Sequence, residues 1–150
     1  MPAFKFMAAA LLLSTASAFA QTPTAGKALV YVYRTPGQYQ ALVPYSIYDS
    51  EKKLVTLPHS GEWAVLDADP GEMSLTRRYP VTMTITSPSG VAKTTSGMVS
   101  SRPLTLQVAA GMTYYVNVET LGNNKLIGLR TEAKARKEMQ KCEEVKATGP

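Results

Sequence analysis

The sequence has few of the residues from which catalytic and metal centres are built. Among 150 residues it holds one histidine, His59, and one cysteine, Cys142. A single histidine excludes a zinc site made from a histidine cluster and a proton relay between two histidines, and a single cysteine excludes a disulfide within the chain. Nucleophile elbows, phosphate loops and dinucleotide fingerprints are also missing. We therefore expect a protein that is not an enzyme and that binds no cofactor or metal.

Long basic and long apolar runs are missing as well. The formal net charge of +5 is spread along the chain. The basic residues outside the C-terminal segment form no run longer than the pairs Lys52-Lys53 and Arg77-Arg78, which argues against a nucleic-acid partner. The apolar run at residues 6–13 is interrupted by Ser14, well short of the roughly 20 residues that a membrane-spanning helix needs. We expect neither a nucleic-acid partner nor a membrane span.

The first 20 residues have the three parts of a secretory signal peptide. Lys5 supplies the basic start, residues 6–13 the apolar run, and Ala18-Phe19-Ala20 the small side chains of a cleavage site. Residues 1–20 are predicted to be removed, so that the mature chain begins at Gln21. Because no cysteine lies near the cut, we expect no lipid anchor and place the protein, of bacterial type, in the periplasm or outside the cell.

The mature chain has the size of one domain. Residues 21–26 are small and polar and predict a flexible lead-in, residues 27–146 a single domain, and residues 147–150 a disordered tail. Residues 27–34 carry apolar side chains on both faces, which predicts a central strand covered on two sides. Further strands are expected over residues 42–49, 54–57, 62–68, 73–78, 104–109, 112–119 and 125–130, with a turn at Asn123-Asn124.

Residues 81–101 are rich in Ser, Thr and Gly and predict a hairpin extension at one edge of the sheet. After Arg130 the period changes, and Thr131 is placed to cap a helix that runs to about Val145. Its apolar stripe predicts that it packs on the sheet; the stripe consists of Ala135, Met139, Cys142 and Val145. With no helices between the strands, the pattern predicts an all-β fold, an antiparallel β-sandwich with one C-terminal α-helix.

Three segments resemble the bacterial domain-of-unknown-function family 2846. They are the opening strand at residues 27–34, the turn Asp69-Pro70-Gly71-Glu72 and the strand at residues 110–116. The resemblance covers roughly residues 27–142. It implies a prealbumin-like β-sandwich in a small exported protein, without known catalytic residues. The chain departs from the lipoprotein members of that family, since it lacks a cysteine at the cleavage site.

The remaining polar candidates are better explained as turn residues. His59 lies between Pro58 and Ser60, where a solvated loop histidine is favoured over a base or ligand. Asp67 and Asp69 share one face of an extended segment, but calcium needs several more oxygen ligands nearby. Asp69 also suits the first position of a turn that continues with Pro70 and Gly71.

Aromatic residues are the one feature that suggests a surface. On the strand phasing, Tyr48 and Tyr115 point away from the core, and with Trp63 they form a possible ligand or partner surface. Cys142 packs as a buried thiol or pairs with another molecule in an oxidising compartment. We therefore expect a non-catalytic cell-envelope module that binds a protein partner or itself. Binding of glycan or peptidoglycan through exposed Tyr and Trp is the alternative.

Overall fold

The first strand is apolar on both faces and lies at the centre of the fold. The computed structural model describes residues 21–37, 41–118 and 127–147. In it, β1 (Ala28–Tyr33) is buried at every position, as the sequence predicts. The signal peptide, the Asn123-Asn124 turn and residues 148–150 lie outside the described residues.

The first sheet is built around β1. Its strand order is β10-β4-β1-β8-β9, and β1 pairs with β4 in antiparallel and with β8 in parallel orientation. The bounds are Glu62–Ala68 for β4, Thr113–Asn117 for β8, Gly128–Arg130 for β9 and Glu143–Glu144 for β10.

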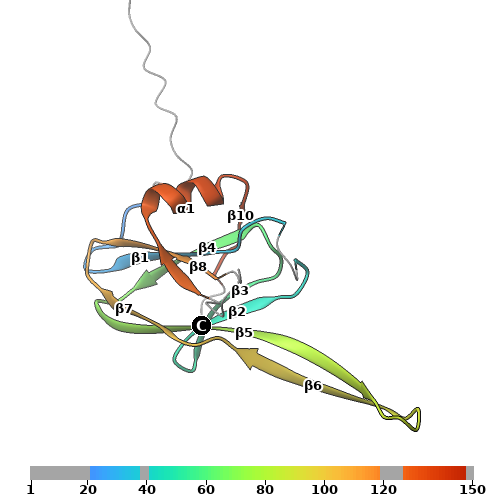
Figure 1. Ribbon diagram of the computed structural model, residues 1–150. Helices are drawn as coiled ribbons and strands as arrows, with labels where there is room; N and C mark the ends of the chain where they lie inside the picture. Colours follow the sequence, from blue (N-terminus) through green and yellow to red (C-terminus); the bar gives the residue numbers. More distant parts are fainter. Residues whose placement is uncertain (1–20, 38–40, 119–126, 148–150) are drawn as a thin grey trace, which may run out of the picture.

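The second sheet has the order β3-β2-β5-β6, and β7 pairs with the first part of β5. Its strands are β2 (Tyr45–Asp49), β3 (Lys52–Leu57), β5 (Gly71–Thr86), β6 (Ala92–Ser100) and β7 (Leu104–Val108). The two sheets enclose one apolar core, to which β1 contributes its even-numbered side chains and β5 its odd-numbered ones, Met73 and Leu75. The helix α1 (Glu132–Met139) covers the other face of the first sheet, giving three layers (Figure 1).

This arrangement confirms the all-β sandwich with a C-terminal helix. Most strand pairs are antiparallel, whereas β1 with β8 and β10 with β4 are parallel. Pro44 immediately precedes β2, where its missing N–H costs no ladder bond. Gly71 takes a φ of 136° at the turn into β5, a backbone conformation that favours glycine. No helix in the described ranges is long and apolar enough to span a membrane.

The C-terminal helix is shorter than the sequence predicted, because the chain behind it joins a sheet. The helix ends at Met139, and the N–H groups of Glu143 and Val145 donate to the carbonyls of Gly61 and Trp63 at the edge of the first sheet. Pairing with β4 replaces the helical hydrogen bonds of this segment and covers an open sheet edge. Cys142 therefore lies beyond the helix and not on it.

The hairpin extension predicted over residues 81–101 is present and forms a long two-stranded ribbon. Strand β5 continues without a break from the sandwich to Thr86, and β6 pairs with it from Ala92 to Ser100. Figure 1 shows this ribbon, coloured yellow-green (β5) to gold (β6), projecting far from the sandwich. We call residues 79–99 the arm.

Candidate functional site

The aromatic surface expected from the sequence does not form. Trp63 and Tyr115 are only 3% and 4% exposed, beneath the helix α1. Tyr31 lies between them, stacked on Tyr115 at 5.2 Å and tilted against Trp63 at 5.7 Å. Tyr48 lies on the second sheet, half-buried, with the Arg78 guanidinium 4.3 Å from its ring centre. The phasing placed Tyr115 correctly on the face away from the sandwich core, but the helix covers that face.

The polar candidates His59, Asp67 and Asp69 each have a partner within the protein. The ring Nδ1 of His59 lies 3.0 Å from a carboxylate oxygen of Glu62, and the His59 N–H donates to the other oxygen at 2.7 Å. Asp69 pairs with Lys27 at 3.1 Å, and the Thr24 hydroxyl donates to Asp67 at 3.5 Å. In the described part of the chain, no three His, Cys, Asp or Glu side chains are grouped so as to hold a metal ion.

Two fully buried arginines enclose a tyrosine inside the sandwich. The guanidinium carbons of Arg34 and Arg77 lie 3.7 and 4.2 Å from the centre of the Tyr45 ring. The Arg34 guanidinium donates to the carbonyls of Val43 at 2.7 Å and Leu57 at 3.3 Å. Arg77 donates to the Val118 carbonyl at 2.8 Å. These arginines hold chain segments from both sheets around one ring, and none of these contacts was predicted.

The sequence did contain a signal for them. Arg77 shares its strand face with Met73 and Leu75, which point into the core, and Arg34 continues the core-facing series of β1. Alternation therefore places both guanidinium groups between the sheets. The burial of these two arginines was not predicted, because arginine is a charged residue that is seldom fully buried.

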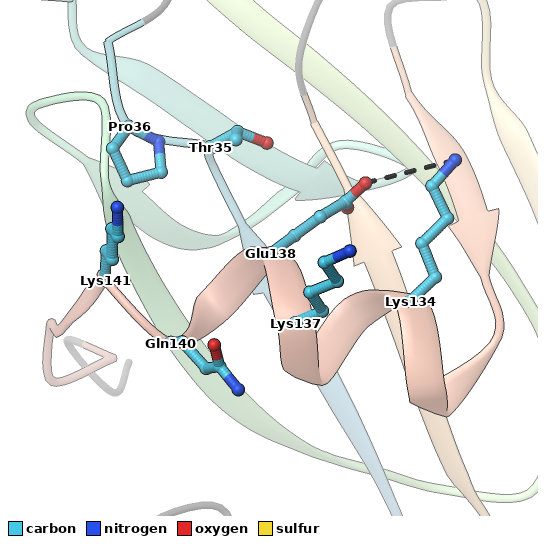
Figure 2. A pocket seen from close by; sticks show the side chains of 7 residues that line it. All are labelled: Thr35, Pro36, Lys134, Lys137, Glu138, Gln140 and Lys141. Atoms are coloured by element: carbon cyan, nitrogen blue, oxygen red, sulfur yellow. Dashed lines mark ion pairs between the residues drawn. The ribbon is translucent and has the colours of Figure 1, made fainter.

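An open hollow of about 660 Å³ lies between the helix and the segment that follows β1. Figure 2 shows Lys134, Lys137 and Lys141 around it, with Thr35 and Pro36 on the opposite wall. Glu138 is its single carboxylate, 3.9 Å from the Lys134 ammonium group.

Glu138 is engaged in holding the helix to the sheet. Its carboxylate accepts the Tyr33 hydroxyl at 2.5 Å and the Asn117 amide at 3.4 Å. The Asn117 amide also donates to the Thr35 hydroxyl at 3.0 Å. Burial raises the pKa of Tyr33 well above its ordinary value, and the Glu138 carboxylate raises it further. The network joins α1 to β1 and β8, which indicates a structural role for these groups.

Cys142 borders the same helix. It is half-buried against the aromatic cluster under α1, and its thiol lies 3.4 Å from the Arg34 carbonyl and 3.6 Å from that of Glu138.

The arm presents two chemically different faces. In its regular antiparallel register, Tyr79 lies opposite Val99 and Thr86 opposite Ala92, and directly opposed side chains share a face. The odd-numbered face therefore carries mainly apolar side chains: Tyr79, Val81, Met83, Ile85, Val91 and Val99. The even-numbered face carries mainly hydroxyls, among them Thr82, Thr84, Thr86, Thr94 and Ser96, with Met98 near the arm root as its large apolar side chain.

The apolar face of the arm continues the core-facing side of β5. Met73 and Leu75 are buried in the sandwich, and Tyr79 still packs on its edge. Further out, the same face is open: Met83 is 61%, Ile85 63% and Val91 66% exposed. Large apolar side chains grouped on one exposed face mark an interaction surface.

Neither a family model, nor a curated protein, nor a solved structure matches this chain.

Proposed function

We propose that this protein is an exported, non-catalytic module of the cell envelope that binds a protein partner through the apolar face of its arm. Export rests on the signal-peptide pattern of residues 1–20. The resemblance to the domain-of-unknown-function family 2846 stays a prediction from the sequence.

The observation that carries the proposal is the exposed apolar face beyond Tyr79. Strands β5 and β6 extend far outside the sandwich (Figure 1). A two-stranded ribbon alone is marginally stable in water, and this ribbon leaves Met83, Ile85 and Val91 open to solvent. A protein surface placed on that face removes the apolar area from water and supports the ribbon.

The other candidate surfaces are less suited to binding. Glycan binding needs exposed aromatic rings, but two of the candidate rings, Trp63 and Tyr115, are covered by the helix. The lysine-lined hollow beside α1 has Glu138 as part of the helix-to-sheet network.

Matched lysine pairs on the two faces of the arm test the proposal. Met83→Lys with Ile85→Lys places charge on the apolar face, and Thr82→Lys with Thr84→Lys places the same charge on the hydroxyl face of the same strand. All four positions are exposed, so both variants are expected to fold with the melting temperature of the unmodified protein. Each tagged protein is then cross-linked chemically in intact cells, so that weak complexes are retained, and its apparent size is measured in the exported fraction.

The unmodified protein and the hydroxyl-face variant are expected to migrate as a complex larger than the monomer, and the apolar-face variant as the monomer. A monomeric unmodified protein, or equal loss of the complex in both variants, contradicts the proposal.

A further inference from the structure

We propose that the partner of the arm is a second copy of this chain, joined by antiparallel pairing of β6 with β6 about a two-fold axis at Ser96. This inference rests on the proposed function, because it names the occupant of the arm.

The hydrogen bonds at both ends of the arm show which backbone groups face outward. At the root, the Ser101 N–H donates to the Arg77 carbonyl; at the tip, the Ser87 N–H donates to the Val91 carbonyl. The register between these points is regular. The backbone N–H and C=O groups of the odd-numbered residues therefore form the hydrogen bonds between β5 and β6. Backbone direction alternates along a strand, and the N–H and C=O groups of the even-numbered residues of β6 therefore point to its outer edge. Among the described residues, no strand pairs with that edge.

The outward-facing positions are symmetric. They are Ala92, Thr94, Ser96, Met98 and Ser100, and Ser96 is their midpoint. An isologous pair uses the same surface on both copies. Pairing about Ser96 sets Ala92 opposite Ser100 and Thr94 opposite Met98, so that every outward backbone group of one β6 meets one of the other.

This edge has few of the features that keep strand edges apart. Natural edge strands carry charged side chains, proline or bulges that oppose pairing with another copy. Strand β6 has neither proline nor a register shift, and Lys93 is its single charged residue. In the proposed register, Lys93 faces Val99. The two Lys93 side chains are then roughly 20 Å apart along the strands, beyond a Debye length of about 8 Å at physiological salt.

The opposite edge of the ribbon is protected. The Ser50 N–H donates to the Ser74 carbonyl, so the even-numbered residues of β5 face the side of β2. Pro80 has this orientation just past the last β2 pair, Ser46 with Arg78. Proline offers no N–H there, which favours β6 as the docking edge.

The two-fold arrangement also places the exposed apolar side chains of the arm next to the second copy. Each arm then runs past the other in the opposite direction, and the tip, with Ile85 and Val91, comes beside the partner's arm root. At the root, the first sheet already overlies the odd-numbered face of β5. Pairing of one short edge buries less than the roughly 800 Å² per partner of a standard interface. We therefore expect a reversible dimer with a dissociation constant on the order of 10–100 μM.

Sedimentation equilibrium of the purified protein over this concentration range tests the inference. Ser96→Pro removes an N–H that faces the outer edge of β6, and Thr84→Pro removes the equivalent N–H on the other edge as the matched control. Neither N–H bonds within the ribbon. We expect a monomer–dimer equilibrium that Ser96→Pro weakens at least tenfold and that Thr84→Pro leaves within a factor of two.

Cysteine cross-linking tests the register in a Cys142→Ser background. Opposed residues of neighbouring strands have Cα atoms about 4.5–5.5 Å apart, within reach of a disulfide. Ser96→Cys is expected to give a covalent dimer on mild oxidation. A mixture of Ala92→Cys and Ser100→Cys chains is expected to form the mixed dimer in preference to either homodimer. Thr84→Cys serves as the control that does not cross-link.

The outcomes separate this inference from the proposed function. A monomer at all concentrations overturns the second copy as partner, and the lysine-pair experiment then still decides whether the arm binds another protein. A dimer that is insensitive to Ser96→Pro overturns the edge pairing. If cross-linking is equal at residues 84 and 96, the two-fold axis at Ser96 is wrong.

Discussion

At the scale of residues, the unusual feature is a tyrosine ring in contact with two buried guanidinium groups. The guanidinium carbons of Arg34 and Arg77 lie 3.7 and 4.2 Å from the centre of the Tyr45 ring, and both groups donate to backbone carbonyls. The planar guanidinium group does both at once, because its face stacks on a ring while its edge donates hydrogen bonds. A compact ammonium group cannot reproduce this geometry.

Arg34→Lys is therefore expected to destabilise the fold although it keeps the charge. It loses the stack on Tyr45 and leaves a buried carbonyl, that of Val43 or Leu57, without its donor. The expected loss in the free energy of unfolding is about 2 kcal/mol. The exposed Arg102→Lys is the control, with an expected change of less than about 0.5 kcal/mol. Urea denaturation compares the two, and equal stability of both variants would refute a structural role for the stack.

The tyrosines under the helix predict how stability depends on pH. Burial raises the pKa values of Tyr31, Tyr33 and Tyr115 above the ordinary value of 10.0. Because the folded-state pKa lies above the unfolded one, the stabilisation is fully present below pH 10.0 and is lost as pH rises toward the folded value. The melting temperature is expected to fall as pH increases above 10.0. Tyr33→Phe should show a shallower fall, since it removes one titrating hydroxyl; an unchanged slope would count against the Tyr33–Glu138 bond.

Cys142 is expected to be a poorly reactive thiol. It packs half-buried beside Trp63 and Met139, and its sulfur contacts two backbone carbonyls. Thiol labelling is expected to be several times faster after denaturation than in the folded protein. A dominant dimer on a non-reducing gel, sensitive to reductant and absent in Cys142→Ser, would instead support the intermolecular disulfide.

At the scale of elements, alternation predicted which face each strand residue occupies, but not what covers that face. It placed β1 centrally and identified the arm as an extension, whereas the strand expected from residue 42 begins only at Tyr45, after Pro44. It could not show that α1 covers Tyr115, because that contact joins segments far apart in the chain. The end of the helix was also missed, since the pairing of β10 with β4 is a tertiary interaction that local propensity does not encode.

The arm is expected to be dispensable for folding of the sandwich. Replacing residues 82–96 by Asn-Gly joins Val81 to Gly97, a directly opposed pair that suits a two-residue hairpin turn. The removed side chains are exposed apart from the half-buried Ser87 at the tip, so the free energy of unfolding should change by less than about 1 kcal/mol. Loss of a cooperative thermal transition in this variant would show that the arm is part of the folding unit.

At the scale of the whole molecule, the three layers and the arm have separate roles. The sandwich buries its apolar residues between two sheets and under one helix. The arm carries the core-facing pattern of β5 outward beyond the sandwich (Figure 1), where Met83, Ile85 and Val91 are exposed. Under the proposal, the sandwich is the base and the projecting ribbon is the surface that binds a partner.

The most direct test of this claim is a photo-crosslinking amino acid placed at Met83 or at Thr84 in the exported protein. The two positions are adjacent and exposed, but they lie on opposite faces of the arm. The account predicts adducts of defined mass from position 83, several times more abundant than from position 84. Absence of adducts at both positions, or equal yields from the two faces, would contradict it.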